Sequence, residues 1–152
     1  MAKGDARAEL AFVRTWLLDT GPIVAYLNPL DPDHHHSKEA LDEFGGQLVT
    51  TSAVITEAMY FLVRHANGPT LLVEFLATSG TKMVECCQAE DLYRAVQLMT
   101  KYDDTPMDFA DATLVLLADA LGQYDICTLD RRGFRTFRSI KGKRFNLVID
   151  GV

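Results

Sequence analysis

The chain lacks the features that mark secreted and membrane proteins. It has only three cysteines in 152 residues, and two of them, Cys86 and Cys87, are adjacent. This odd count argues against a disulfide framework and favours reduced thiols, as in the cytoplasm. No apolar run approaches the roughly 20 residues that a membrane-spanning helix needs, and the charged N-terminal stretch lacks the apolar core of a signal peptide. These absences predict a cytoplasmic protein with no membrane partner.

The chain also lacks long linkers, internal repeats and low-complexity tracts. Hydrophobic residues make up 48% of it and charged residues 24%, which match a single globular domain with a hydrophobic core. We expect an N-terminal extension over residues 1–14, followed by one domain over residues 15–152.

Short apolar runs alternate with helical patterns along the sequence. This alternation predicts an α/β domain of three layers, α/β/α, in which helices cover both faces of a central, mostly parallel sheet. The expected strands are 15–19, 48–50, 83–86, 126–129 and a run within 145–149. The expected helices are 22–28, 37–44, one capped by Thr51 or Ser52, one beginning within 70–78, and the segments 89–101 and 108–121.

Five acids stand in apolar surroundings, where an unpaired carboxylate is costly to bury. Asp19 and Asp130 each end an apolar, strand-like run, and functional groups collect at the carboxyl ends of strands in such sheets. Glu57 lies inside an apolar stretch, and Asp108 and Asp111 open a helical segment. If the fold brings these acids together, their mutual repulsion calls for a bound cation. Oxygen ligands without cysteine or paired histidine select Mg²⁺ or Mn²⁺ over zinc.

Several of the acids also have a plain structural interpretation. Asp19 and Asp130 stand where a turn or cap residue is common. Glu57 could instead point to the polar side of its helix with Arg64. These alternatives stay open from the residues alone.

The two acids at the start of segment 108–121 are three residues apart, so they share a helix face. Asp108 could be the third residue of a capping box in which Thr105 is the N-cap and Pro106 the first helical residue. Asp111 has no such alternative. We therefore expect Asp111 to be the better ligand and Asp108 a helper.

A basic segment follows Asp130 directly. Residues 131–144 hold almost half of the Lys and Arg residues and no Asp or Glu. The segment is either a solvated loop and edge strand protected by charge, or a surface that holds a polyanion beside an acidic pocket. Arg131 and Arg132 are the candidates for phosphate contact. Thr128 faces the same side of the expected strand as Asp130 and could hydrogen-bond a ligand or water.

Four segments together resemble the PIN-domain ribonucleases, and within that family the VapC-like toxins of toxin–antitoxin pairs. The segments are LLDTGPIVAYLN, TTSAVITEAMYFL, PMDFADATLVLLA and ICTLDRRGF, and they span most of the chain. The resemblance implies a metal-dependent endoribonuclease that hydrolyses RNA and leaves a 5′-phosphate. It also implies an RNA substrate, a small antitoxin partner and a homodimer.

The resemblance assigns roles to residues of this chain. Asp19 and Asp111 would be the primary metal ligands, while Glu57 and Asp130 would orient the attacking water or a second ion. Asp108 lies one turn before the family's helix Asp, and the Thr128 and Thr20 hydroxyls would assist. The expected metal site is thus Asp19, Glu57, Asp111 and Asp130, the expected catalytic set adds Asp108 and Thr128, and Arg131 and Arg132 would contact RNA.

Other functions fit the sequence less well. The tripeptide Asp19-Thr20-Gly21 matches aspartic proteases, but those need an all-β architecture. A haloacid-dehalogenase-type phosphatase needs Asp-x-Asp after the first strand, and here Gly21 stands at the second position. The run His34–His36 is interpreted as a polar helix entry rather than a metal site. Within the resembled family, an inactive scaffold or a housekeeping RNA-processing nuclease remains the alternative.

Overall fold

The computed structural model describes residues 13–86 and 88–149. Among them, five strands form one sheet in the order β3-β2-β1-β4-β5, and every pair is parallel. The first strand in the sequence is therefore the middle strand of the sheet. The strands are β1 (Thr15–Leu18), β2 (Gln47–Thr50), β3 (Lys82–Met83), β4 (Asp125–Cys127) and β5 (Asn146–Leu147).

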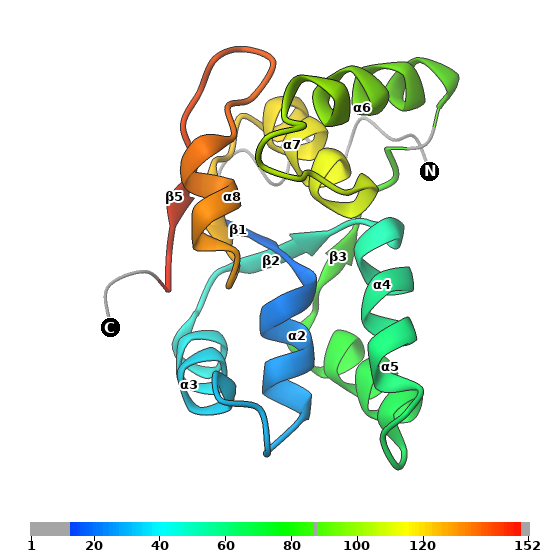
Figure 1. Ribbon diagram of the computed structural model, residues 1–152. Helices are drawn as coiled ribbons and strands as arrows, with labels where there is room; N and C mark the ends of the chain where they lie inside the picture. The colour runs from blue at the N-terminus through cyan, green and yellow to red at the C-terminus, as the bar shows by residue number, and fades with distance from the viewer. Residues whose placement is uncertain (1–12, 87, 150–152) are drawn as a thin grey trace.

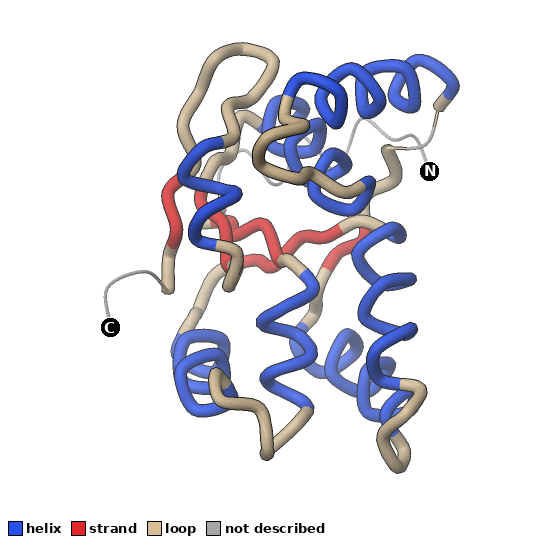
Figure 2. The backbone as a smooth tube through the Cα atoms, in the orientation of Figure 1, coloured by secondary structure: helices blue, strands red, loops and turns tan. Residues whose placement is uncertain are grey.

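Helices cover both faces of this sheet (Figures 1 and 2). The three-layer α/β/α prediction is confirmed. One layer holds α2 (Thr20–Leu27), α3 (His34–Glu43), α4 (Ser52–Leu62) and α5 (Gly68–Ser79), and the other holds α6 (Ala89–Lys101), α7 (Phe109–Leu121) and α8 (Arg131–Thr136).

The core runs along the middle of the sheet and under α7. All four residues of β1 are buried, because the strand has neighbours on both edges and helices on both faces. The helix α7 is buried over most of its length, which explains its apolar run. No helix in the described ranges is long and apolar enough to cross a membrane.

Four of the five strands are shorter than the apolar runs predict, and β2 is one residue longer. β3 covers only Lys82–Met83, and β4 ends at Cys127 rather than Leu129. The described Cys86 is buried beyond the end of β3, whereas Cys87 and most of the proposed N-terminal extension lie outside the described residues. Parallel pairing extends only as far as the neighbouring strands match in register, so hydrophobic residues beyond that point pack without joining the ladder.

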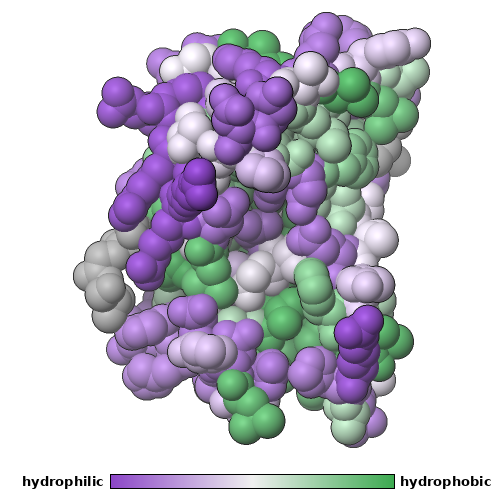
Figure 3. All heavy atoms as spheres, in the orientation of Figure 1, coloured by the Kyte–Doolittle hydropathy of each residue, from purple (hydrophilic) through white to green (hydrophobic). Residues whose placement is uncertain are grey.

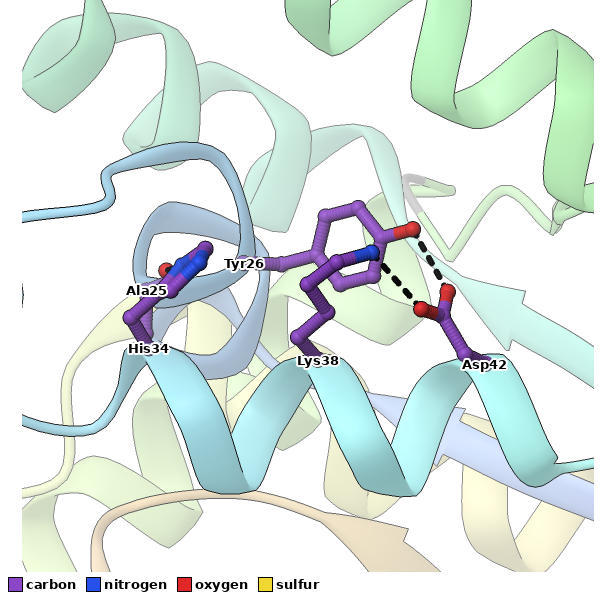
Figure 4. A network of polar contacts seen from close by, with 5 residues as sticks. All are labelled: Ala25, Tyr26, His34, Lys38 and Asp42. Atoms are coloured by element: carbon purple, nitrogen blue, oxygen red, sulfur yellow. Dashed lines mark hydrogen bonds and ion pairs between the residues drawn. The ribbon is translucent and has the colours of Figure 1, made fainter.

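The histidine run belongs to a helix and not to the loop before it. The helix α3 begins at His34, whose Nδ1 lies 2.7 Å from the Ala25 carbonyl oxygen of α2. Figure 4 shows this contact beside a second link, in which Asp42 accepts hydrogen bonds from Tyr26 (2.6 Å) and Lys38 (2.7 Å). Such exposed pairs add little stability. The Tyr26–Asp42 hydrogen bond and the His34–Ala25 contact join α3 to α2, whereas the Lys38–Asp42 pair lies within α3.

Gly68, the first residue of α5, sits against the end of α4 with no room for a side chain. A Cβ there would overlap the Leu62 carbonyl oxygen, a backbone atom that cannot move alone. We expect Gly68→Ala to lower the free energy of unfolding by about 1–3 kcal/mol in urea titrations. The matched control is Gly45→Ala, since no described atom outside the immediate chain neighbours lies within 4 Å of a Cβ at Gly45. Equal stability of the two variants would contradict this packing argument.

Candidate functional site

Asp19 lies between β1 and α2, where it is both a helix cap and a residue of the acidic pocket. It is the N-cap of α2, and its Oδ1 accepts a hydrogen bond from the Thr20 N–H at 2.8 Å. Its Oδ2 accepts one from the Thr128 hydroxyl at 2.6 Å, across to the chain that follows β4. The side chain is only 6% exposed. Burial raises the pKa of Asp19 to about 6, against the lowering effect of both hydrogen bonds, and the nearby charges of Asp108 and Asp130 raise it further.

The start of α7 differs from the prediction, because Asp108 and not Thr105 is the N-cap. Asp108 has extended backbone geometry, and its Oδ1 accepts from the Asp111 N–H at 2.8 Å. In return, Asp111 Oδ2 accepts from the Asp108 N–H at 3.1 Å. The capping box therefore begins three residues later than expected. Asp111, for which we expected no capping role, is its third helical residue.

Capping does not remove the electrostatic cost of Asp111. Burial is the largest cause that raises its pKa, to about 8, and the charges of Asp19, Asp108 and Asp130 add to it. The hydrogen bond from the Asp108 N–H acts in the opposite direction. A carboxyl held in this way is destabilised as an anion unless a cation joins it.

Glu57 on α4 lines the same pocket. Thr51 is the N-cap of α4, and its hydroxyl meets that of Thr113 on α7 at 2.8 Å, which fixes α4 beside α7. Glu57 follows six residues later, in the middle of α4, and is partly buried. Its pKa is raised by burial first, then by a contact with the Asp108 carboxylate and by the Asp108 and Asp19 charges, while a hydrogen bond from Thr20 opposes the rise.

Thr128 links two of the acids, Asp19 and Asp130, through hydrogen bonds. The Thr128 hydroxyl donates to Asp19 and accepts from the Asp130 N–H at 3.0 Å. Asp130 Oδ1 in turn accepts from the Gly133 N–H at 3.0 Å, which caps the short helix α8. This helix was not expected from the sequence. The side chain of Phe134, which has no exposed surface, packs in the core and anchors the helix.

These acids surround one pocket of about 370 Å³ at the carboxyl ends of β1 and β4. The pocket brings together all five acids singled out from the sequence. Two further acids, Asp31 and Asp33 of the loop between α2 and α3, also line it. Both lie in a segment rich in Pro and Asp, which predicts a turn but does not predict that its acids line the pocket. The lining residues are Asp19, Thr20, Gly21, Val24, Asp31, Asp33, Glu57, Phe61, Asp108, Asp111, Leu129 and Asp130.

The basic segment lies beside the pocket and does not line it. Arg131 and Arg132 are exposed at the start of α8, next to Asp130. Farther along, Arg138 donates to three carbonyl groups of residues 135–137, and the Lys141 ammonium group contacts the Asp119 carbonyl oxygen at 3.2 Å. The segment thus consists of a short helix and a hydrogen-bonded turn. Arg131 and Arg132 are its only arginines that directly follow Asp130, one of the pocket acids.

The donors of this pocket fit a hard divalent cation in type and charge. They are carboxylate oxygens, and Asp19, Glu57 and Asp111 have raised pKa values to which the neighbouring acids contribute. As they lie, no three Asp, Glu, His or Cys side chains of the described residues are arranged to hold one ion. Asp108, Asp111 and Asp130 instead accept hydrogen bonds from backbone N–H groups at the starts of α7 and α8.

Comparisons with known proteins agree with this architecture. The family model described as "PIN domain" matches residues 16–140. Ribonuclease VapC26 of Mycobacterium tuberculosis is 32% identical over 134 residues, which cover 87% of this chain and 98% of the relative. The crystal structure of Mycobacterium tuberculosis VapC20, described as a Sarcin-Ricin loop cleaving toxin, superposes with a TM-score of 0.69. It is 18% identical, with 78% of this chain and 91% of that chain covered, and so it shows the fold alone. The chain belongs to the PIN domain family.

Proposed function

We propose that the chain is an Mg²⁺- or Mn²⁺-dependent endoribonuclease and the toxin of a toxin–antitoxin pair. The observation that carries the proposal is the convergence of five acids, from both ends of the chain, on one pocket. Two further findings support it: the family membership and the name of the relative, a ribonuclease. A small antitoxin, a homodimer and a cytoplasmic location are part of the same proposal.

In this proposal the acids bind the cation, and neighbouring residues orient the acids through hydrogen bonds. Asp19 and Asp111 are the primary ligands, with Glu57 and Asp130 beside them. When bound, Mg²⁺ or Mn²⁺ neutralises charge on the scissile phosphate and lowers the pKa of a water for in-line attack on phosphorus. The Thr128 hydroxyl and the Thr20 N–H fix the Asp19 carboxylate in place.

The remaining residues position water and RNA. Glu57 is partly exposed to the pocket and accepts a hydrogen bond from the attacking water. The water oxygen bonds to phosphorus as the bond from phosphorus to the 3′-oxygen breaks. The water gives up one proton and the leaving 3′-oxygen takes one up from solvent, so the products carry a 5′-phosphate and a 3′-hydroxyl. Arg131 and Arg132 contact flanking phosphates, since their exposed guanidinium groups are placed next to Asp130.

Two measurements test the proposal. The purified chain should cleave single-stranded RNA with Mn²⁺ or Mg²⁺ and stop when EDTA is added. Its inducible expression should arrest growth, and co-expression of the adjacent small open reading frame should relieve the arrest. Cleavage that persists in EDTA contradicts the metal mechanism, and cleavage without growth arrest favours a housekeeping nuclease.

Gly133 allows Asp130 to take its position, which gives a further prediction. A Cβ at Gly133 would overlap the Asp130 carboxylate, the flexible end of a side chain that can rotate away. We expect Gly133→Ala to reduce RNA cleavage roughly tenfold, because about 1.4 kcal/mol of lost transition-state stabilisation corresponds to that factor. Its melting temperature should also fall by a few degrees, because the Asp130 cap of α8 is weakened and the buried Phe137 ring lies 3.0 Å from the added Cβ.

The control for this prediction is Thr136→Ala, at the other end of α8. The Thr136 hydroxyl donates only to the Arg132 carbonyl group in its own helix, at 2.9 Å. Thr136→Ala should keep full activity. If both variants lose activity equally, the effect belongs to the helix α8 as a whole and not to the Asp130 carboxylate.

A further inference from the structure

A second hollow lies on the other side of Glu57 and Asp108 from the acidic pocket. Its volume is about 570 Å³, and it lies between α4 and the start of α7, two helices that are in contact. Both acids line the two hollows at once. Figure 1 shows the beginning of α4 near the beginning of α7. The lining residues are Ser52, Ala53, Thr56, Glu57, Tyr60, Asp108, Phe109 and Ala110.

Aromatic side chains are exposed around this hollow. Tyr60, which lines it, is 61% exposed, and its neighbour Phe61, which lines the acidic pocket, is 48% exposed. Their rings meet edge to face at 5.5 Å, and Phe109 adds a third ring from α7. Figure 3 shows hydrophobic side chains among hydrophilic ones over the part of the surface where α2 and α4 lie. Exposed aromatic rings beside a polar pocket indicate a binding surface.

The polar groups of the hollow suit a nucleobase. The Arg64 guanidinium group lies 5.7 Å from the centre of the Tyr60 ring, so it places a positive charge at that ring. The hydroxyl of Thr56 and the carboxylate of Glu57 can accept hydrogen bonds from base N–H groups. Single-stranded RNA is bound in this way elsewhere, by aromatic rings that stack bases and cations that hold phosphates.

We infer that this hollow is a nucleobase subsite for the nucleotide next to the scissile phosphate, with the base stacked on Tyr60. The inference rests on the proposed function, because the scissile phosphate must lie in the acidic pocket. Continuity of the two hollows through Glu57 and Asp108 is what favours RNA over a polypeptide. A base attached to that phosphate through its sugar has the adjoining hollow within reach.

The test compares variants of Tyr60 on defined RNA. Tyr60→Leu removes the ring and keeps an apolar side chain, whereas Tyr60→Phe keeps the ring. In cleavage of a fluorescent single-stranded RNA oligomer with Mn²⁺, Tyr60→Leu should raise KM roughly tenfold. Its kcat should stay near the wild-type value, because stacking contributes equally before and during the reaction. Tyr60→Phe should keep the wild-type KM. Tyr93→Leu, at an exposed aromatic residue on α6, is the control.

Abasic substrates identify the base that occupies the hollow. Oligomers with one abasic nucleotide on either side of the cleaved bond are compared for wild type and Tyr60→Leu. On one side, loss of the base should raise KM for wild type and have no further effect in the variant. Equal penalties in both proteins overturn the subsite but leave the nuclease intact. An unchanged RNA KM in Tyr60→Leu, together with weaker binding of a co-expressed polypeptide, assigns the hollow to protein instead. Failure of the wild type to cleave any oligomer overturns the proposed function and the subsite with it.

Discussion

Asp19→Asn should lower the rate of RNA cleavage roughly 10²–10³-fold, as the loss of one preorganised electrostatic group does in other enzymes. Asp19 is the most buried of the acids and the one that the structure holds from two directions. The substitution removes the negative charge and keeps the shape. Asparagine is as good an N-cap as aspartate, so α2 should still begin at the same residue. The loss should therefore appear in kcat at unchanged helix content, measured by RNA cleavage with Mn²⁺ and by circular dichroism.

The sharpest control for this variant is Asp125→Asn, at the opposite end of the sheet. Asp125 begins β4, and its carboxylate accepts a hydrogen bond from the Asn146 side chain at 2.9 Å, which an amide oxygen can also accept. It does not line the acidic pocket. We expect wild-type cleavage from Asp125→Asn. Full activity in Asp19→Asn would sink the assignment of the site.

The second large effect is a loss of stability in the metal-free protein as the pH rises. Asp19 and Asp111 have native pKa values of about 6 and about 8, above the ordinary value of 3.8. The native state thus binds more protons than the unfolded state between these values. The stability that these carboxyl groups contribute is complete below about pH 4. It is lost as the pH rises through 6 for Asp19 and through 8 for Asp111.

For Asp19 the magnitude follows from its shift. Each pKa unit corresponds to 1.36 kcal/mol, so Asp19 alone accounts for about 3 kcal/mol. This is enough to lower the melting temperature by on the order of 5 °C or more in a domain of this size. The measurement is thermal melting in EDTA from pH 4 to pH 8.5, because the contribution of Asp19 is lost between about pH 4 and pH 6. The predicted slope is downward over that range.

Substitution and metal addition separate this effect from the general titration of the chain. Asp111→Asn should melt at a higher temperature than wild type at pH 8.5, and the difference should shrink at pH 5.5. Mn²⁺ should raise the melting temperature of wild type more at pH 8.5 than at pH 5.5, because the ligands must lose their protons to bind it. A melting temperature of wild type that is independent of pH and of Mn²⁺ would falsify the cation site.

The layers of the fold and the membership of the acidic site could be predicted because both rest on long, regular signals. Alternating apolar runs and helical patterns determine an α/β sheet, and acids at the ends of β1 and β4 must then lie at the same edge. This placed Asp19 beside Asp130 without any knowledge of contacts. Glu57 could be placed because an acid in an apolar helical stretch is unusual.

The rest depends on local geometry that a sequence leaves open. The capping box at α7 is shifted by three residues because Asp108 competes with Thr105 for the N-cap, and tertiary contacts decide between them. The helix α8 has only six residues, too few for a periodic signal, and depends on the buried Phe134 and on the Asp130 cap. Asp31 and Asp33 line the pocket from the loop between α2 and α3, and which way such a loop turns depends on how those two helices pack.

The position of β1 in the middle of the sheet also determines when the acidic site is assembled during synthesis. The hydrogen bond from Thr128 to Asp19 joins residues 109 positions apart, and it forms only after β4 has paired with β1. During translation, all residues through Asp130 must therefore leave the ribosome before the last of the five acids can join the others. A nascent chain that ends before β4 has Asp19 and Glu57 but not Asp130. For a protein that we propose to cut RNA, this order of synthesis delays activity until β4 has been made and has paired with β1.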